Sequence, residues 1–312
     1  QVREMACGDW VYSAGFSADG TLIVSGDESG AMTVWSAATG AKVREMAFGW
    51  TVCSASFSAD GTLIVSGDTS GIVTVWLAAT VAKVHEMACG SWVHSAGFSA
   101  DGTLIVSGDF SKKVTVWSAA TGAKVCEMAC GGSVNSAGFS ADGTLIVSGD
   151  TSGIVTVWLA ATGAKVCEMA CGGSVYSAGF SADGTLIVSG DDMDKVTVWF
   201  AATGAKVCEM ACGDWVYSAG FSADGTLIVS GDRSGKVTVW LAATGAKVCE
   251  MACGGSVYSA GFSADGTLIV SGDSSGKVAV WSEPSPSSTA LVASNLARIP
   301  AAIPASTLVQ QG

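Results

Sequence analysis

The sequence predicts an all-β fold built from seven copies of one four-stranded unit. A Val-Trp pair recurs at a constant interval of 41 residues, and its tryptophans are Trp35, Trp76, Trp117, Trp158, Trp199, Trp240 and Trp281. Inside each unit, apolar and polar residues alternate with the period of two that is typical of strands. Glycine-rich turn motifs separate these short segments, and the repeats show no helical periodicity.

The strands of the first unit follow in order from its pattern. Val11–Phe16 and Thr21–Ser25 flank the turn Ser-Ala-Asp-Gly, which predicts a β-hairpin with an Asp-Gly turn. A second turn, from Gly26 to Gly30, leads to a third strand at Met32–Trp35. A last turn containing Thr-Gly leads to a fourth strand at Val43–Met46. Each unit is therefore expected to form one small antiparallel sheet.

Units of this kind resemble the WD-repeat family of β-propellers. The matching motifs are Phe16-Ser17-Ala18-Asp19-Gly20, Ser25-Gly26, Val34-Trp35 and Thr39-Gly40, which are similar to the family's Phe-Ser-Pro-Asp-Gly, Ser-Gly, Ile-Trp and Thr-Gly. The resemblance covers residues 1–283 and implies a seven-bladed propeller of four-stranded antiparallel blades. The last unit stops after its third strand, at Trp281, and Val2–Met5 matches a fourth strand. We expect this N-terminal strand to close the last blade.

Several polar positions of the family are changed in this chain. The family usually has a Gly-His pair before the first strand, an Asp in the turn before the third strand and an Asp after the Trp, which join a Ser in a buried hydrogen-bond network. In the first unit, Cys7 or a neighbouring glycine takes the His place, Ser29 replaces the turn Asp, and Ser36 follows the Trp. The network is thus expected to be absent or rebuilt. We expect Asp27 and its equivalents to cap the turn backbone instead.

Charge and hydropathy exclude two classes of partner. The chain has 15 basic and 27 acidic residues and a net charge of −12, which opposes binding to nucleic acid or to an anionic membrane surface. Its apolar runs are far shorter than the roughly 18 residues of a membrane span. We therefore expect a soluble protein that binds neither nucleic acid nor membranes.

The cysteines and histidines predict neither a cofactor nor catalysis. Four of the eleven cysteines stand four residues before another cysteine, as Cys126 stands before Cys130. Four residues of strand span about 13 Å, too far for a disulfide or for one zinc ion. The two histidines, His85 and His94, are each alone in their unit, so the sequence predicts no metal, no cofactor and no enzyme. Unpaired thiols favour a reducing compartment, the cytoplasm or nucleus.

The units differ mainly in two loops, which the strand order places at one end of the ring. These are the segment around the start of the first strand and the turn between the second and third strands. Aromatic residues with polar neighbours, typical of interface hot spots, gather there. The predicted partner-binding residues are Trp10, Tyr12, Trp50, Trp92, His94, Phe110, Tyr176, Asp192, Trp215, Tyr217, Arg233 and Tyr258. The family resemblance implies that this end is a docking surface for peptides and proteins.

We therefore expect a non-catalytic interaction scaffold, monomeric within a larger assembly or chain. The acidic excess in the variable loops favours a basic or neutral protein or peptide. The alternatives are a carbohydrate-binding propeller, a propeller enzyme and the recognition module of a larger receptor-like protein. Residues 284–312 contain all four prolines among Ser and Ala, which predicts a linker or disordered tail after the propeller.

Overall fold

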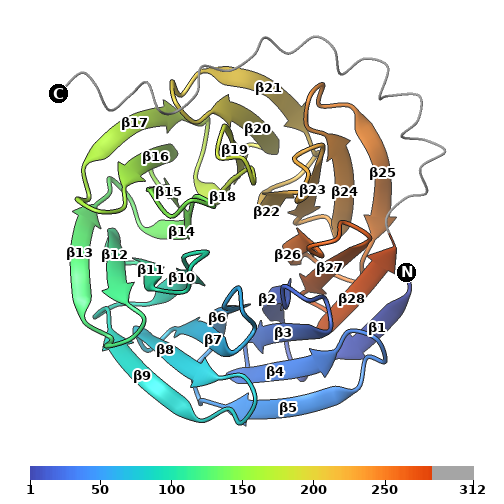
Figure 1. Cartoon of the computed structure of the whole chain (residues 1–312). Coiled ribbons are helices and arrows are strands. Elements are labelled where there is room, and N and C mark those ends of the chain that lie inside the picture. The colour runs from blue at the N-terminus through green and yellow to red at the C-terminus, as the bar shows by residue number, and fades with distance from the viewer. Residues whose placement is uncertain (283–312) are drawn as a thin grey trace.

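Seven four-stranded antiparallel sheets form a closed ring in the computed structural model, which describes residues 1–282 (Figure 1). The predicted fold class is confirmed, and no helix occurs within this described range. We number the sheets as blades I to VII, with blade I starting at Val11. The predicted boundary at residue 283 and the tail predicted for 284–312 lie outside the described residues.

In blades I to VI the four strands follow one another from the centre of the ring to its perimeter in sequence order, whereas in blade VII the N-terminal strand takes the outermost place. The innermost strands are β2 (Val11–Phe16), β6 (Val52–Phe57), β10 (Val93–Phe98), β14 (Val134–Phe139), β18 (Val175–Phe180), β22 (Val216–Phe221) and β26 (Val257–Phe262). The second strands are β3 (Leu22–Asp27), β7 (Leu63–Asp68), β11 (Leu104–Asp109), β15 (Leu145–Asp150), β19 (Leu186–Asp191), β23 (Leu227–Asp232) and β27 (Leu268–Asp273).

The third strands are β4 (Ala31–Ser36), β8 (Ile72–Leu77), β12 (Lys113–Ser118), β16 (Ile154–Leu159), β20 (Lys195–Phe200), β24 (Lys236–Leu241) and β28 (Lys277–Ser282). The outermost strands are β5 (Lys42–Ala47), β9 (Lys83–Ala88), β13 (Lys124–Ala129), β17 (Lys165–Ala170), β21 (Lys206–Ala211), β25 (Lys247–Ala252) and, for blade VII, β1 (Arg3–Ala6).

The second strand is longer than its pattern predicts. We expected a turn from Gly26, but β3 continues to Asp27, and Gly26 pairs with Ser13 and Met32 inside the sheet. The reason is tertiary: a Cβ on Gly26 would lie 2.5 Å from Cγ1 of Val52 in the next blade. The glycine is needed for close packing between blades, a role that strand-internal glycines often have.

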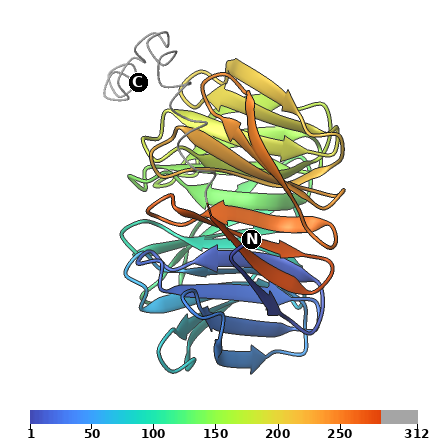
Figure 2. The same cartoon turned by 90° about the vertical axis from the view of Figure 1, so that its right-hand side faces the viewer.

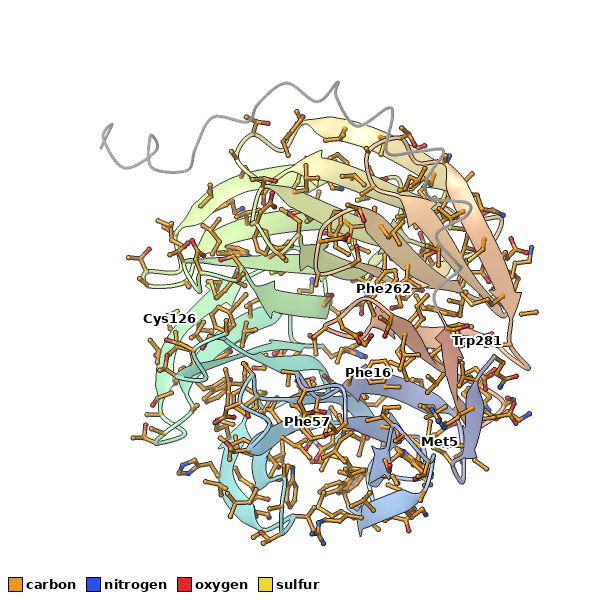
Figure 3. All side chains as sticks on the ribbon, turned by 45° about the vertical axis from the view of Figure 1, so that its right-hand side comes forward. Met5, Phe16, Phe57, Cys126, Phe262 and Trp281 are labelled. Atoms are coloured by element: carbon orange, nitrogen blue, oxygen red, sulfur yellow. The ribbon has the colours of Figure 1, made fainter. Side chains whose placement is uncertain are left out.

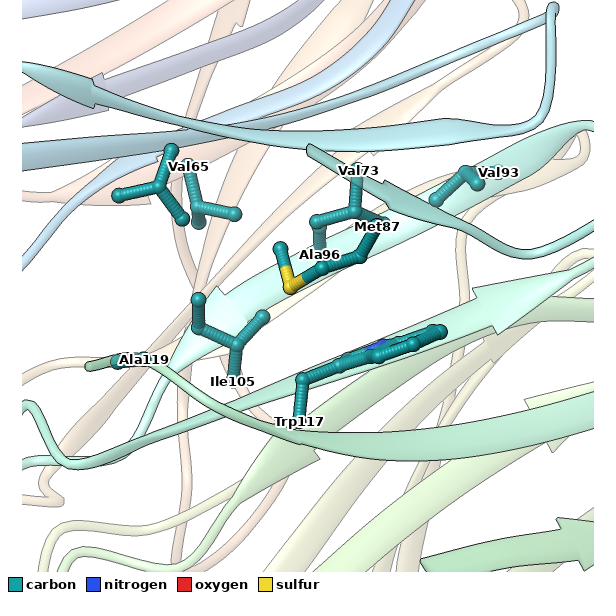
Figure 4. Packing of buried hydrophobic residues seen from close by; sticks show 9 residues of the cluster. Val65, Val73, Met87, Val93, Ala96, Ile105, Trp117 and Ala119 are labelled. Atoms are coloured by element: carbon teal, nitrogen blue, oxygen red, sulfur yellow. The ribbon is translucent and has the colours of Figure 1, made fainter. Parts of the chain in front are cut away.

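The hydrophobic core is divided among the seven junctions between neighbouring blades. At the junction of blades II and III, Met87 of β9 packs with Ile105 and Trp117 of blade III, and all three side chains are buried (Figure 4). Equivalent clusters occur at every other junction of the ring. Each blade therefore buries its apolar surface only by contact with its neighbours, so the fold is stable only as a ring.

The N-terminal strand closes the ring, as predicted. β1 pairs antiparallel with β28, and the side view shows it beside that strand (Figure 2). Glu4 forms an ion pair with Lys277 across this edge, with 2.8 Å between Oε1 and Nζ. Met5 is buried against residues of blades VII and I, in the same region of Figure 3 as Trp281. The closing junction thus has the same kind of core as the others.

The family's hydrogen-bond network is rebuilt rather than lost. In blade I, Nε1 of Trp35 donates to Oγ of Ser25 at 2.8 Å, and Sγ of Cys7 lies 3.7 Å from the same oxygen. The cysteine therefore stands in for the histidine. Asp27 accepts the backbone N–H of Ala31 and the hydroxyl of Ser29, so the predicted turn cap is confirmed. Except in blade II, where Phe48 replaces the cysteine, every blade has the same three-residue chain.

Val81 occupies a turn position that favours glycine. Its φ is 54°, in the left-handed region, whereas the equivalent residues are glycines in five other blades, with Gly122 at 69°. A β-branched residue in this region costs about 1–2 kcal/mol. We expect Val81→Gly to raise the free energy of unfolding by about 1 kcal/mol and the melting temperature by roughly 2 °C. The matched change, Gly122→Val, should lower both, and a stabilising Gly122→Val would contradict this explanation.

Candidate functional site

The two variable loops of each blade lie side by side, as predicted. In blade I, the backbone N–H of Glu28 donates to the carbonyl of Trp10 at 2.9 Å. The same bond joins the other variable pairs, which are Thr69 to Thr51, Phe110 to Trp92, Thr151 to Ser133, Asp192 to Ser174, Arg233 to Trp215 and Ser274 to Ser256. Every blade therefore presents one pair of variable residues at the same end of the ring.

A third variable residue lies in a β-bulge at the start of each innermost strand. In β2, Val11 pairs with Asp27 and Ser13 pairs with Gly26, so Tyr12 between them has no partner residue. The equivalent bulge residues are Cys53, His94, Asn135, Tyr176, Tyr217 and Tyr258. Bulges reorient side chains and are frequent at functional sites. Because the innermost strands surround the centre in Figure 1, these seven residues form a ring there.

Four successive bulge tyrosines form an arc across blades V, VI, VII and I. Ring centroids are separated by 5.1 Å for Tyr176 and Tyr217, by 5.0 Å for Tyr217 and Tyr258, and by 4.9 Å for Tyr258 and Tyr12. Burial, with a contribution from the Glu28 carboxylate, raises the pKa of Tyr12 to about 12. The pKa values of the other three are also raised, mainly by burial. All four hydroxyls therefore stay protonated near pH 7.

Two tryptophans extend this arc at matched places. Trp215 of blade VI stacks on Tyr176 of blade V, with centroids 6.3 Å apart, and Trp10 of blade I lies 6.2 Å from Tyr258 of blade VII. Both follow the same sequence, Cys-Gly-Asp, and in both loops the Asp side chain accepts the backbone N–H of the tryptophan. We call these two sites, at the V/VI and VII/I junctions, the tryptophan notches.

The innermost strands are joined differently at the two notches. At the other five junctions, a serine hydroxyl of one blade donates to an alanine carbonyl of the next, as Ser13 does to Ala55 at 3.1 Å. At the notches the equivalent hydroxyls, of Ser177 and Ser259, are buried without a hydrogen-bond partner within the described residues. A buried hydroxyl without a hydrogen-bond partner lowers the free energy of unfolding, so each notch makes the fold less stable.

The notches differ in charge. The guanidinium of Arg233 lies 4.5 Å from the centroid of Trp215, a cation–π contact at the V/VI notch. At the VII/I notch the equivalent turn residue is Glu28, and Asp9 precedes Trp10. The first site therefore has a cation on its aromatic surface, and the second is acidic.

A third aromatic group lies on blade III. Trp92 and Phe110 are joined by the backbone bond between their loops, and their ring centroids lie 5.8 Å apart. His94, the bulge residue of this blade, lies 6.3 Å from Phe110. Burial lowers the pKa of His94, so its imidazole is neutral near pH 7. This group is exposed: Trp92 and Phe110 leave 53% and 54% of their surface open to solvent.

In four blades, Ser or Thr occupies the position of the loop tryptophan, and its hydroxyl forms a hydrogen bond to the preceding blade. The hydroxyl of Ser256 donates to the carbonyl of Arg233 in the preceding blade at 2.8 Å, and Thr51, Ser133 and Ser174 make the same link to their preceding blades. Trp10, Trp92 and Trp215 cannot make this bond. Each therefore replaces a link between blades with an exposed aromatic ring, so packing within the propeller does not explain these tryptophans.

A family model described as the first β-propeller of IFT122 matches residues 10–282. The chain belongs to this family. It is thus a WD-type propeller, a domain that is commonly a non-catalytic interaction scaffold. No curated protein matches the chain. Residues 1–282 include no helix with the length and hydropathy needed to span a bilayer.

The structure of this IFT122-type propeller brings together most of the predicted site residues, but not all. Trp50 lies one position before the other loop tryptophans, next to Thr51, and has no aromatic contact within the described residues. Asp192 is in the turn of blade V, next to Met193, an exposed residue that our prediction did not include. Asn135 was also missed, although it occupies a bulge; its Nδ2 donates to the carbonyl of Val175 at 2.9 Å. Met193 and Asn135 both lie at positions where the units differ, so comparison of the units could have identified them.

The thiols of the IFT122-type propeller are unpaired and weakly acidic. All eleven cysteines are free, and burial raises the pKa of Cys53 to about 12 and that of Cys130 to about 11. The first cysteine of each pair is partly buried: Cys126 lies on the perimeter in Figure 3, and its Sγ is 3.7 Å from the carbonyl of Ala160 in the next blade. Arg3 donates to the equivalent carbonyl, that of Ala37, and Nε2 of His85 lies 2.9 Å from the carbonyl one residue further on, that of Ala120. No cluster of three potential metal ligands occurs in residues 1–282.

Proposed function

We propose that this propeller binds a protein or peptide on the end of the ring that presents the variable loops. The observation that carries the proposal is that three loop tryptophans occupy positions where Ser or Thr would link two blades. The four-tyrosine arc adds adjoining amphipathic surface. Aromatic rings that end in polar groups are the side chains most enriched in interface hot spots.

The charges at the VII/I notch support a partner whose segment bound at that notch is basic or neutral. At the VII/I notch, burial raises the pKa of Tyr12, and the nearby carboxylates of Glu28 and Asp9 raise it further, as expected where two negative charges lie close to the ring. A Lys or Arg side chain would find an aromatic face and a carboxylate there. The bound segment is proposed to follow the tyrosine arc from this notch toward Arg233.

The cellular setting is part of the same proposal. Eleven unpaired thiols support the cytoplasm or nucleus, where thiols stay reduced. The family description, which speaks of a first β-propeller, supports a propeller domain that acts within a larger assembly or chain.

The test is selection of a random-peptide display library against the purified protein. Peptides enriched over an unrelated protein are synthesised, and their affinities are measured by fluorescence anisotropy. We expect Trp10→Ala or Trp215→Ala to weaken binding about 30-fold, the effect of losing a hot spot worth about 2 kcal/mol. The matched control is Thr121→Ala or Thr162→Ala, in exposed turns at the opposite end of the ring, which should leave the affinity unchanged.

Two outcomes would overturn the proposal. One is that no peptide is enriched, while a glycan array detects sugars that bind through the same tryptophans; the propeller would then be a lectin. The other is that selected peptides bind the tryptophan variants as tightly as the unchanged protein.

A further inference from the structure

A cleft of about 580 Å³ opens at the perimeter of the ring between blades I and II, outside the tyrosine arc. It lies between the outermost strand β5 of blade I and strands β8 and β9 of blade II, which are neighbours in Figure 1. Its apolar lining is Met46, Phe48, Trp50, Ile72, Trp76 and Val81. Ligand sites in proteins commonly have volumes of about 300–1,000 Å³, so the cleft is large enough for a small organic molecule or two side chains.

Substitutions peculiar to this junction line the cleft. Phe48 replaces the cysteine that contacts the buried serine in the other blades, and its ring packs edge-on against Trp76 with centroids 4.8 Å apart. Val81 replaces a turn glycine, and Trp50 stands one position before the usual loop tryptophan. At this junction Asp68 is 9% exposed, whereas its equivalents in the other six blades are 1–3% exposed. A carboxylate that is normally shielded therefore reaches the cleft.

A lysine that other blades have at this place is missing. In blade III, Nζ of Lys113, the first residue of β12, lies 2.7 Å from Oε1 of Glu127 on β13. Blades V, VI and VII have the same pair between their third and outermost strands. In blade II the lysine is replaced by Ile72, and within the described part of the chain Glu86 has one ion pair, with Lys83. Ile72 and Glu86 both line the cleft. The cleft therefore includes the space next to Glu86 that the lysine ammonium group occupies in blades III, V, VI and VII.

The charges in the cleft are unbalanced. Asp68 and Glu86 are two carboxylates, and among residues 1–282 the one cation that lines the cleft is Lys83, whose Nζ lies 5.9 Å from the centroid of Trp76. The surplus is one negative charge next to apolar and aromatic walls. An ammonium group attached to an apolar body matches both features, because it can pair with the carboxylates while its body covers Phe48 and Trp76.

We propose that this cleft is a binding site for a primary ammonium group carried on an apolar or aromatic body. The ammonium takes the place of the lysine that Ile72 replaces and pairs with Glu86 and Asp68. The site is separate from the docking surface proposed above, so either can fail without the other.

The probe is tryptamine, titrated into the full chain and followed by ¹H–¹⁵N spectra of the tryptophan indole groups. We expect saturable shifts with a Kd of about 1 mM, the affinity usual for a fragment of this size. Indole-3-propionate, which has a carboxylate in place of the ammonium, should bind at least tenfold more weakly. Equal binding of the two compounds, or no saturable binding of tryptamine, would overturn the proposal.

The repeats offer a matched pair of variants. Ile72→Lys restores the lysine of blade III, which is expected to fill the cleft, pair with Glu86 and weaken tryptamine binding at least tenfold. Ile154→Lys makes the same change in blade IV, where no Phe or extra Trp opens the junction, and should leave the affinity unchanged. Lysine is the native residue at this position in four blades, so both variants should fold, and melting curves will check this. Unchanged binding to the Ile72→Lys variant would place tryptamine elsewhere.

A second ligand tests whether the ammonium group belongs to a lysine side chain of a peptide or to a free amine. Capped Trp-Lys dipeptide presents an indole and a lysine side chain as a partner protein would. Binding tighter than that of tryptamine assigns the site to a peptide, and weaker binding assigns it to a free amine. The Trp10→Ala and Trp215→Ala variants should bind both ligands normally, which separates this site from the notches.

Discussion

A chain that lacks residues 1–6 should lose several kcal/mol of stability and expose a strand edge. The deletion removes β1 and with it Met5, which is 3% exposed. Truncating a buried Met alone typically costs about 2–5 kcal/mol, and the ladder bonds to β28 are lost as well. We expect the melting temperature to fall by roughly 10 °C. The uncovered edge of β28 should also promote association, which light scattering after gel filtration will detect.

Two controls separate loss of the strand from loss of its side-chain contacts. Glu4→Gln removes the exposed ion pair with Lys277 but keeps the strand, and should cost less than about 1 kcal/mol. A synthetic peptide of residues 1–8, added to the shortened chain, should restore most of the melting temperature. A shortened chain that stays monomeric and melts within about 2 °C of the full chain would show that the ring does not depend on this closure.

Gly149→Ala should be among the most damaging single-methyl additions in the protein. Its new Cβ would lie 2.4 Å from Cγ1 of Val175 in the next blade, a distance that requires the two blades to separate. Overpacking of this kind costs typically 1–3 kcal/mol, and we expect about 3 kcal/mol because the obstacle is a branched side chain on a rigid strand. Urea unfolding followed by tryptophan fluorescence will measure the change.

The matched control is Gly138→Ala in the same blade. A Cβ on Gly138 has no atom within 4 Å, so this substitution should change stability by less than about 0.5 kcal/mol. The double variant Gly149→Ala/Val175→Ala removes the clashing methyl groups and should cost about 2 kcal/mol less than the sum of the two single changes. Equal effects of the two alanine substitutions, or strict additivity in the double variant, would contradict the role assigned to Gly149.

Much of the fold could be predicted from the sequence because the same pattern of strands and turns occurs in seven copies. One unit with four alternating segments is weak evidence for four strands, whereas seven in-phase copies leave little freedom in how the chain is divided. Ring closure was also predictable, since Val2–Met5 matches the fourth strand that the last unit lacks. The errors came at Gly26 and its equivalents, where a residue that usually marks a turn is set by contact with the next blade.

The candidate site was predictable in part. Comparison of the units identified the variable positions and the end of the ring that they share. It could not show that Trp10 and Trp215 form two equivalent notches, because that depends on contacts with Tyr258 and Tyr176 of neighbouring blades. It also missed the cleft beside Ile72, which requires the coincidence of Phe48, Trp50 and Val81 at one junction.

The sequence by itself determined the number of blades, their strands, the closing strand and the variable end of the ring. These properties follow from local alternation, turn residues and exact repetition, which are all readable along one chain. Only the tertiary structure decided which side chains meet: the cysteine that contacts the buried serine in place of the family's histidine, the unpaired hydroxyls at the notches and the residues that line the cleft between blades I and II. The physical reason is that the core lies between neighbouring blades, so the notches and the cleft are each formed by two different units, which at the VII/I notch are the first and the last of the repeat.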